Sequence, residues 1–167
     1  MLIEIEMLQW NWSEMRRWRR SLRISRSIES VASAETLWLF LIEPERIQKW
    51  CVPIRKFRHT GEQRSGVGTT FSFEEKAAGQ LMKLNFVITE WVVNRSLAFR
   101  MTSGNLVKGY EQRYTIEAIP TGSRFTCTED IELPYGILGK FIGLFRRSFS
   151  EAHLERMLLE LKSLAET

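Results

Sequence analysis

The chain has 167 residues, of which 44% are hydrophobic and 26% charged. These values are typical of one globular domain with a buried core, and they exclude a collagen-like, disulfide-dense or disordered chain. No apolar run approaches the roughly 18 residues that a membrane-spanning helix needs. The formal charge of +4 comes mainly from the first 26 residues. Since no basic stripe runs through the rest, we do not expect nucleic acid as a partner.

The two cysteines, Cys51 and Cys127, stand far apart and form no CxxC pattern. Two separate thiols suit a reducing compartment and argue against a disulfide framework. The first ten residues contain acids where a secretory signal needs bases. We therefore predict no export signal and a cytoplasmic protein.

Residues 1–21 are predicted to form a basic amphipathic extension ahead of the domain. Apolar side chains recur at helical spacing at Leu8, Trp12, Met15, Trp18 and Leu22, and four arginines occupy the other side: Arg16, Arg17, Arg19 and Arg20. A helix of this kind can rest on an anionic membrane surface through its arginines. Alternatively, the helix packs on the domain or on a partner chain, or residues 1–21 form a poorly ordered extension.

The domain itself is predicted to span residues 22–167. Apolar and polar residues alternate over positions 22–28, which predicts a first strand. Ser33 is placed to cap a short helix. Pro44 opens a second short helix that runs to Trp50, because proline fits the first turn of a helix.

Six strands divided by turn residues are predicted after these helices. They cover residues 54–60, 69–75, 81–92, 97–101, 110–116 and 125–131. Each strand alternates apolar with polar residues, which is typical of an antiparallel meander with one face toward solvent. A slip in the alternation near Glu90 and Trp91 predicts a β-bulge.

A long helix is predicted from Ile137 to the C-terminus. Its apolar side chains change face, because those over 137–149 share one side and those over 154–164 lie nearly opposite. A straight helix cannot bury both sets against one sheet. We therefore expect a break or kink near Phe149–Glu151, with the first part of the helix covering the mouth of a pocket.

This order of elements, a strand, two short helices, a six-strand meander and a long C-terminal helix, is the helix-grip arrangement. Five segments resemble the polyketide cyclase/dehydrase branch of the START-like (SRPBCC) superfamily. They are residues 33–38 (SAETLW), 44–50 (PERIQKW), 66–68 (GVG), 133–136 (LPYG) with Gly139, and 158–166 (LLELKSLAE). The resemblance covers about residues 23–166. It implies an α+β helix-grip fold, with a curved antiparallel sheet of about seven strands wrapped around the C-terminal helix.

The same resemblance implies a deep apolar cavity between the sheet and the long helix. Such proteins bind lipids, sterols, quinones, polyketides or plant-hormone-like molecules. A few of them catalyse reactions, and no catalytic residue is common to all members, so the resemblance assigns a kind of pocket without assigning a reaction.

Large apolar side chains on the strands and helices are predicted to form the wall of that cavity. The strand residues are Phe71, Phe73, Leu84, Phe86, Leu97, Phe99, Met101, Tyr110 and Tyr114; the helix residues are Trp38, Trp50, Phe141 and Phe145. Taken alone, such residues either fill a core or line a small-molecule site. The resemblance favours the second interpretation.

Gln112 and Glu129 fall on the apolar face of their strands. An unpaired buried carboxylate costs several kcal/mol or has a raised pKa. We therefore predict that both side chains orient a hydroxyl or carbonyl group of a ligand, and that Glu129 is the best candidate for a general acid or base. Alternatively, the alternation is misjudged by one residue, or Glu129 lies near a strand end and reaches water.

The two histidines, His59 and His153, show no metal-ligand spacing, and no Ser/His/Asp cluster is evident. We therefore expect no metal site, hydrolase triad or other cofactor. The preferred hypothesis is a non-enzymatic carrier of a small hydrophobic molecule, as a monomer or homodimer. The alternatives are a cyclase or dehydratase that uses Glu129, and an interaction module that uses the basic N-terminal arm.

Overall fold

The computed structural model describes residues 21–51, 54–77, 80–132 and 136–167; at positions 21, 76–77 and 136–150 it describes the backbone only. The predicted N-terminal helix, with Arg16, Arg17, Arg19 and Arg20, lies outside the described residues. No helix in the described part of the chain is long and apolar enough to cross a membrane.

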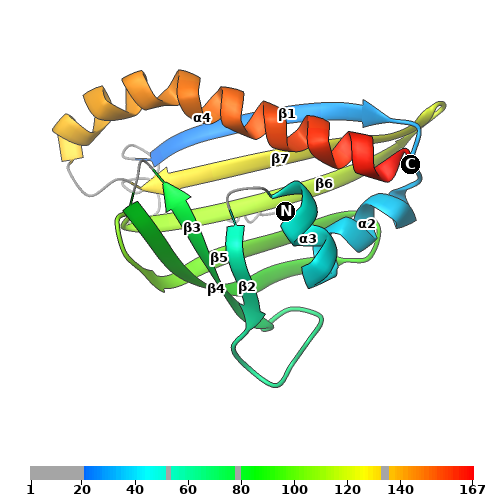
Figure 1. Ribbon diagram of the computed structural model, residues 1–167, viewed down its shortest axis with the longest axis horizontal. Helices are drawn as coiled ribbons and strands as arrows, with labels where there is room; N and C mark the ends of the chain where they lie inside the picture. Colours follow the sequence, from blue (N-terminus) through cyan, green and yellow to red (C-terminus); the bar gives the residue numbers. More distant parts are fainter. Residues whose placement is uncertain (1–20, 52–53, 78–79, 133–135) are drawn as a thin grey trace, which may run out of the picture.

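Within these described ranges, seven strands and three helices follow one another in the predicted order (Figure 1). They are β1 (Ser21–Ser30), α2 (Ala34–Ile42), α3 (Pro44–Trp50), β2 (Ile54–His59), β3 (Thr70–Ala77), β4 (Gln80–Val92), β5 (Ser96–Gly104), β6 (Gly109–Ile119), β7 (Gly122–Glu132) and α4 (Gly136–Ala165). The strands form one antiparallel sheet in the order β1-β7-β6-β5-β4-β3-β2. The prediction of an α+β helix-grip fold is therefore confirmed.

The first and last strands pair along their whole length, so that Ser21 lies opposite Glu132 and Ser30 lies opposite Ser123. The turn between β6 and β7 comes very close to the end of β1. Gly122 adopts a φ of +141° there, and a Cβ atom at this position would stand 2.1 Å from the carbonyl oxygen of Ser30. Glycine is thus required where the meander closes onto the first strand.

The two short helices form for the reasons that the sequence indicates. The Ser33 side chain accepts a hydrogen bond from the Thr36 backbone N–H at 3.2 Å and caps α2. Pro44 occupies the first turn of α3. The indole N–H of Trp50 donates to the Phe40 carbonyl oxygen at 2.9 Å. This bond ties the end of α3 to α2 and fixes the position of the Trp50 ring.

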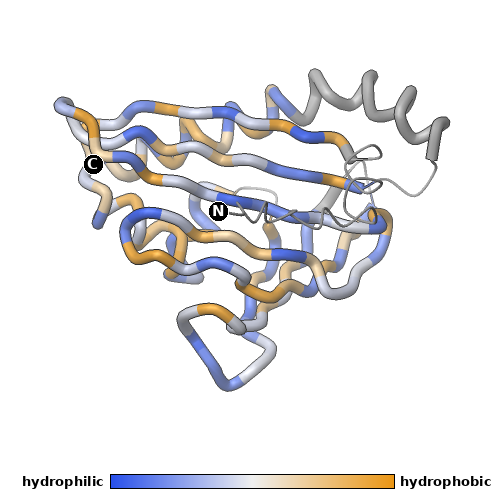
Figure 2. Tube along the Cα trace, turned by 180° about the vertical axis from the view of Figure 1, so that it is seen from behind, coloured by the Kyte–Doolittle hydropathy of each residue, from blue (hydrophilic) through white to orange (hydrophobic). Residues whose placement is uncertain are grey.

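Buried and more exposed residues alternate along much of β4, β6 and β7. Figure 2 shows the corresponding bands of hydrophobic and hydrophilic residues along the strands. The predicted β-bulge is confirmed, because the pairing of β4 with β5 shifts register between Ile88 and Glu90. An extra residue in one strand reverses the alternation beyond it. Consequently Trp91 faces inward, whereas Glu90 faces outward and pairs with Arg113.

The long helix α4 runs as one element from Gly136 to Ala165, so a break near Phe149–Glu151 is wrong, and the alternative of a kink there stays a prediction. A helix satisfies its backbone hydrogen bonds internally, and a change of apolar face therefore does not force it to end. Leu154, Leu158 and Leu161 are fully buried and form the face that packs against the sheet. An ion pair of 2.7 Å between Arg26 and Glu151 fastens the helix to β1.

Candidate functional site

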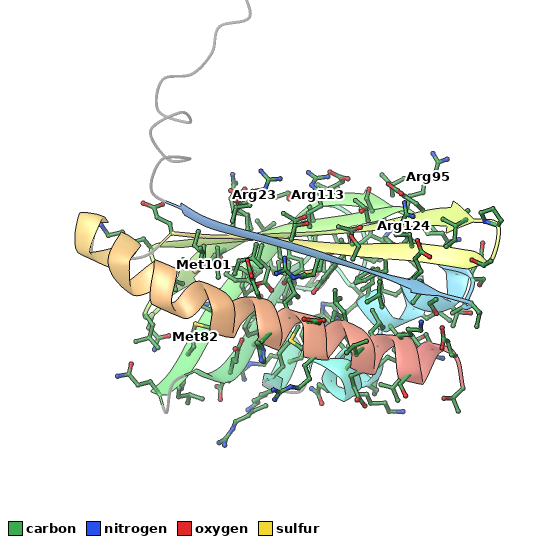
Figure 3. All side chains as sticks on the ribbon, turned by 90° about the horizontal axis from the view of Figure 1, so that it is seen from above. Arg23, Met82, Arg95, Met101, Arg113 and Arg124 are labelled. Atoms are coloured by element: carbon green, nitrogen blue, oxygen red, sulfur yellow. The ribbon has the colours of Figure 1, made fainter. Side chains whose placement is uncertain are left out.

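A cavity of about 380 Å³ lies between the inner face of the sheet, the two short helices and the C-terminal half of α4. All seven strands contribute side chains to its wall, because the sheet curls around the helix. Figure 3 shows α4 between β1 and β7 on one side and the β3–β4 hairpin on the other. The volume falls within the usual range of small-molecule sites, which is about 300–1,000 Å³.

Aromatic rings in mutual contact form one side of the cavity wall. The Phe57 ring stacks on Phe71 with 5.1 Å between centroids, and Phe71 meets Phe99 edge-on at 5.2 Å. Phe99 in turn contacts Tyr114, and Tyr114 contacts Trp50, each at 5.9 Å. All five side chains line the cavity. Rings held by such contacts form a rigid apolar surface.

The structure brings together nine of the residues predicted to contact a ligand: Trp50, Phe71, Phe73, Leu97, Phe99, Tyr110, Gln112, Tyr114 and Glu129. Their location at the cavity wall agrees with the expected role, and the role itself stays a prediction.

Four other predicted residues are not found among those that line the cavity in the described part of the chain. Trp38 is buried and packs edge-on against Trp91 at 5.2 Å. Leu84 and Phe86, each 1% exposed, belong to the core behind the wall, and Met101 packs against that core. Phe141 and Phe145 are on the part of α4 whose side chains the structure does not describe.

A polar cluster on β6 and β7 interrupts the apolar wall. Gln112 and Glu129 lie directly opposite each other in the two strands, which confirms that both face inward. The Gln112 amide donates to Glu129 Oε1 at 3.0 Å and to the Cys127 sulfur at 3.1 Å. The Tyr110 hydroxyl also hydrogen-bonds to the Glu129 carboxylate. The Gln112 amide and the Tyr110 hydroxyl therefore both donate to the Glu129 carboxylate within the cluster.

The environment of Glu129 favours the protonated carboxyl. Burial raises the pKa of Glu129 from 4.5 to about 7, the hydrogen bond from Tyr110 opposes this rise, and the charge of Glu75 adds to it. Burial also raises the pKa of Tyr110 well above its ordinary value, with the Glu129 charge as the next cause. Tyr110 therefore stays a neutral hydrogen-bond donor near pH 7.

Glu75 is a cavity residue that the sequence reasoning missed. It follows Phe71 and Phe73 on the inner face of β3 and lines the cavity, where burial raises its pKa. The signal was present, since the alternation that selects the two phenylalanines also selects position 75. Glu75 was omitted because the predicted wall of the cavity was chosen mainly from large apolar side chains.

Both histidines also line the cavity, which the sequence analysis did not anticipate. His59 lies on β2 with its ring edge-on to Phe57 at 5.7 Å, and its Nδ1 atom is buried without a hydrogen-bond partner among the described residues. Burial lowers the pKa of His59, as does the charge of Arg64, which lines the cavity nearby. The pKa of His153 on α4 is lowered by burial and by Arg156. Both rings are therefore predominantly neutral at pH 7.

In the described ranges, no group of three His, Cys, Asp or Glu side chains is arranged to hold a metal ion. The described wall thus combines a rigid aromatic surface with the hydrogen-bonded cluster of Tyr110, Gln112 and Glu129 and with the separate polar side chains of Glu75, His59, Arg64 and His153.

The family model described as "Polyketide cyclase / dehydrase and lipid transport" matches residues 21–166. The chain belongs to this family. Uncharacterized proteins of Mycobacterium tuberculosis and Mycobacterium bovis are 26% identical to it over 102 residues, which is 61% of this chain. The chain spans 60% of the length of these curated relatives.

Solved structures share the fold at low sequence identity. A START superfamily protein from Mycobacterium smegmatis has a TM-score of 0.72 and 17% identity, with 86% of this chain and 97% of that one aligned. The Zhui aromatase/cyclase from a Streptomyces species has a TM-score of 0.72 at 12% identity, covering 87% and 94% of the two chains. A major latex-like protein of Panax ginseng has a TM-score of 0.68 at 10% identity, covering 89% and 99%.

Proposed function

We propose that the protein binds and carries a small hydrophobic molecule in the cavity between sheet and α4, without transforming it. The observation that carries this proposal is the aromatic-walled cavity of about 380 Å³, interrupted by one internally hydrogen-bonded polar cluster. The driving force is the burial of apolar surface, at about 25 cal/mol per Å². The two free, buried cysteines, Cys51 and Cys127, support a reducing compartment such as the cytoplasm.

The polar cluster supports binding in preference to catalysis. Glu129 accepts hydrogen bonds from Gln112 and Tyr110, so it is held by the wall itself. Such a group orients the polar end of a ligand, because its geometry is fixed before the ligand arrives. Residues on several strands then contribute only apolar contact.

A second candidate function is that of a cyclase or dehydratase with Glu129 as general acid or base. The observation in its favour is the pKa of Glu129, which burial raises to about 7. A group with such a pKa accepts and returns a proton readily near neutral pH. The family description and the shared fold of an aromatase/cyclase are compatible with this alternative.

Calorimetric titration with naphthylethanol, an uncharged apolar probe, tests whether the cavity binds a ligand. We expect one molecule to bind per chain, and Met157→Trp to weaken binding about tenfold or more, because Met157 lines the cavity. Leu159→Trp is the matched control on the same helix, at a position that is 54% exposed. Absence of binding, or equal affinity in the two variants, would contradict the proposal.

Solvent extraction of the purified protein, followed by mass spectrometry, tests the carrier role directly. A carrier releases the bound molecule unchanged after prolonged incubation at neutral pH, whereas an enzyme yields a product. If turnover is seen and Glu129→Gln abolishes it while binding is retained, the second function replaces the first.

A further inference from the structure

Two carboxyl groups face the cavity from distant strands. Glu129 lies on β7 and Glu75 on β3, and the curl of the sheet around α4 turns the two strands toward the same space. The charge of Glu75 acts on Glu129. Any charge on one group therefore disfavours charge on the other.

The hydrogen-bond donors of the surrounding wall are already engaged. The Gln112 amide donates to Glu129 and to Cys127, and the Tyr110 hydroxyl bonds to Glu129. Within the described residues, the Glu75 side chain forms no hydrogen bond or ion pair, and burial raises its pKa. Beside Glu75 and Glu129, the polar surface that remains for a ligand is thus made chiefly of carboxylate oxygens, which accept hydrogen bonds, whereas His59 lies at the other end of the β2–β3 pairing.

No base of the described wall compensates these acids. The cavity is lined by one arginine, Arg64, which acts on His59 at another part of the wall. His59 and His153 both have lowered pKa values, so they carry little charge at pH 7. None of the three is among the groups that shift the pKa of Glu75 or Glu129.

Buried carboxylates in proteins are normally paired with a cation, because an unpaired charge is costly away from water. Here both acids line the cavity. The cavity itself indicates a ligand independently of the two carboxyl groups. We infer that the ligand is an apolar molecule that carries a protonated amine, and that its ammonium group binds to Glu75 and Glu129 while its body packs on the aromatic wall. This inference rests on the proposed function.

The amine satisfies the site in two ways. Its N–H groups donate to the Glu75 carboxylate and to the acceptor positions that Gln112 and Tyr110 leave open on Glu129, and its positive charge offsets the mutual repulsion of the two acids. A ligand with a carboxylate head is excluded by the same acids. A ligand with a hydroxyl head gains the hydrogen bond but not the charge compensation.

Three probes that share a naphthalene ring and differ in their polar group test the inference. They are naphthylethylamine with an amine, naphthylethanol with a hydroxyl, and the naphthylacetate anion with a carboxylate. Calorimetric titration of the full chain at about pH 8, where an alkylamine is still protonated, gives the three affinities. We expect the amine to bind about tenfold or more tightly than the alcohol, and the acetate to bind most weakly. This comparison needs no variant.

Isosteric variants locate the effect. Glu75→Gln and Glu129→Gln should each reduce the preference for the amine over the alcohol, and the double variant should abolish it, because glutamine keeps a hydrogen-bond acceptor but carries no charge. Glu74→Gln is the matched control, because Glu74 precedes Glu75 in β3 but pairs with Lys83 at 3.8 Å outside the cavity. The Glu74→Gln variant should prefer the amine over the alcohol by the same factor as the unaltered chain.

The outcomes separate the two proposals. If the alcohol or the acetate binds as tightly as the amine, or if the preference persists in the double variant, the inference is overturned and the proposed function stands. If none of the three probes binds, the proposed function fails together with the inference.

Discussion

The two faces of the sheet offer carboxyl groups different partners. On the outer face, Glu90 pairs with Arg113, and Arg124 lies 2.7 Å from Glu29. Figure 3 shows Arg113 and Arg124 on the side of the sheet away from α4. On the inner face, Glu129 has an amide and a phenol as partners and no base among the described residues.

This difference reverses the pKa shifts. The pKa of Glu90 is lowered, first by a hydrogen bond from Ser96 and also by Arg113, whereas burial raises that of Glu129 to about 7. Both residues are glutamates, Glu90 on β4 and Glu129 on β7, and they lie on opposite faces of the same sheet. Solvent and bases stabilise a charge outside, and an apolar wall disfavours it inside.

The largest contrast between the faces should come from packing. Phe86 is 1% exposed and contacts Phe73 at 4.8 Å and Phe99 at 5.2 Å. Phe86→Ala should lower the free energy of unfolding by about 3–5 kcal/mol, because it leaves a cavity in the core. Thr126→Ala on the outer face removes one exposed hydrogen bond to Ser27, at a cost of about 1 kcal/mol.

Urea unfolding monitored by circular dichroism measures both changes. Equal losses in the two variants would mean that the inner face is not the packed core that the burial of Phe86 indicates.

Next in size is the pH dependence due to Glu129. Its pKa is about 7 in the folded chain against 4.5 ordinarily. Folding therefore favours the protonated form, and this contribution to stability is complete below about pH 4.5 and lost as the pH rises through about 7. Glu129→Gln should thus be more stable than the original chain by up to about 3 kcal/mol above pH 7, with little difference near pH 4.5.

Glu90→Gln is the control for this prediction on the other face. Because the pKa of Glu90 is lowered, its contribution is present at neutral pH and is lost as the pH falls. The variant should therefore be slightly destabilised near pH 7. Chemical unfolding between about pH 4.5 and pH 8 gives both profiles, and a pH-independent difference for Glu129→Gln would contradict the assignment.

The smallest effect is expected from the outer ion pair alone. Arg113 is about half-exposed, so Arg113→Gln should cost about 0.2–1 kcal/mol at low salt and less in concentrated salt. Arg100→Gln is a suitable control, since Arg100 is exposed on the neighbouring strand and forms no ion pair with described residues. A loss that does not depend on salt would indicate packing instead of charge.

Local patterns predicted much of this architecture. Ser33 and Pro44 mark the starts of α2 and α3, and strand alternation turns Gln112 and Glu129 inward as expected. A helix cap depends on residues that are close in the sequence, and the face of a strand residue depends on the alternation of side chains along the strand. Both patterns can be read from a sequence.

The unpredicted features depend on how the sheet curls. Nothing local distinguishes Phe99, which lines the cavity, from Phe86, which lies in the core behind it. The presence of Glu75 and Glu129 in the wall of one cavity likewise requires the sheet to curl, because β3 and β7 are separated by three strands in the sheet.

The bulge in β4 has a consequence for the composition of the cavity. If the strand continued in regular alternation beyond Ile88, Glu90 would turn inward and Trp91 outward. A third acid would then enter a compartment that already contains two, and an aromatic ring would leave it. The one extra residue at the bulge therefore decides which side chains of β4 face the cavity. Through this choice it sets the number of acidic side chains in the cavity wall.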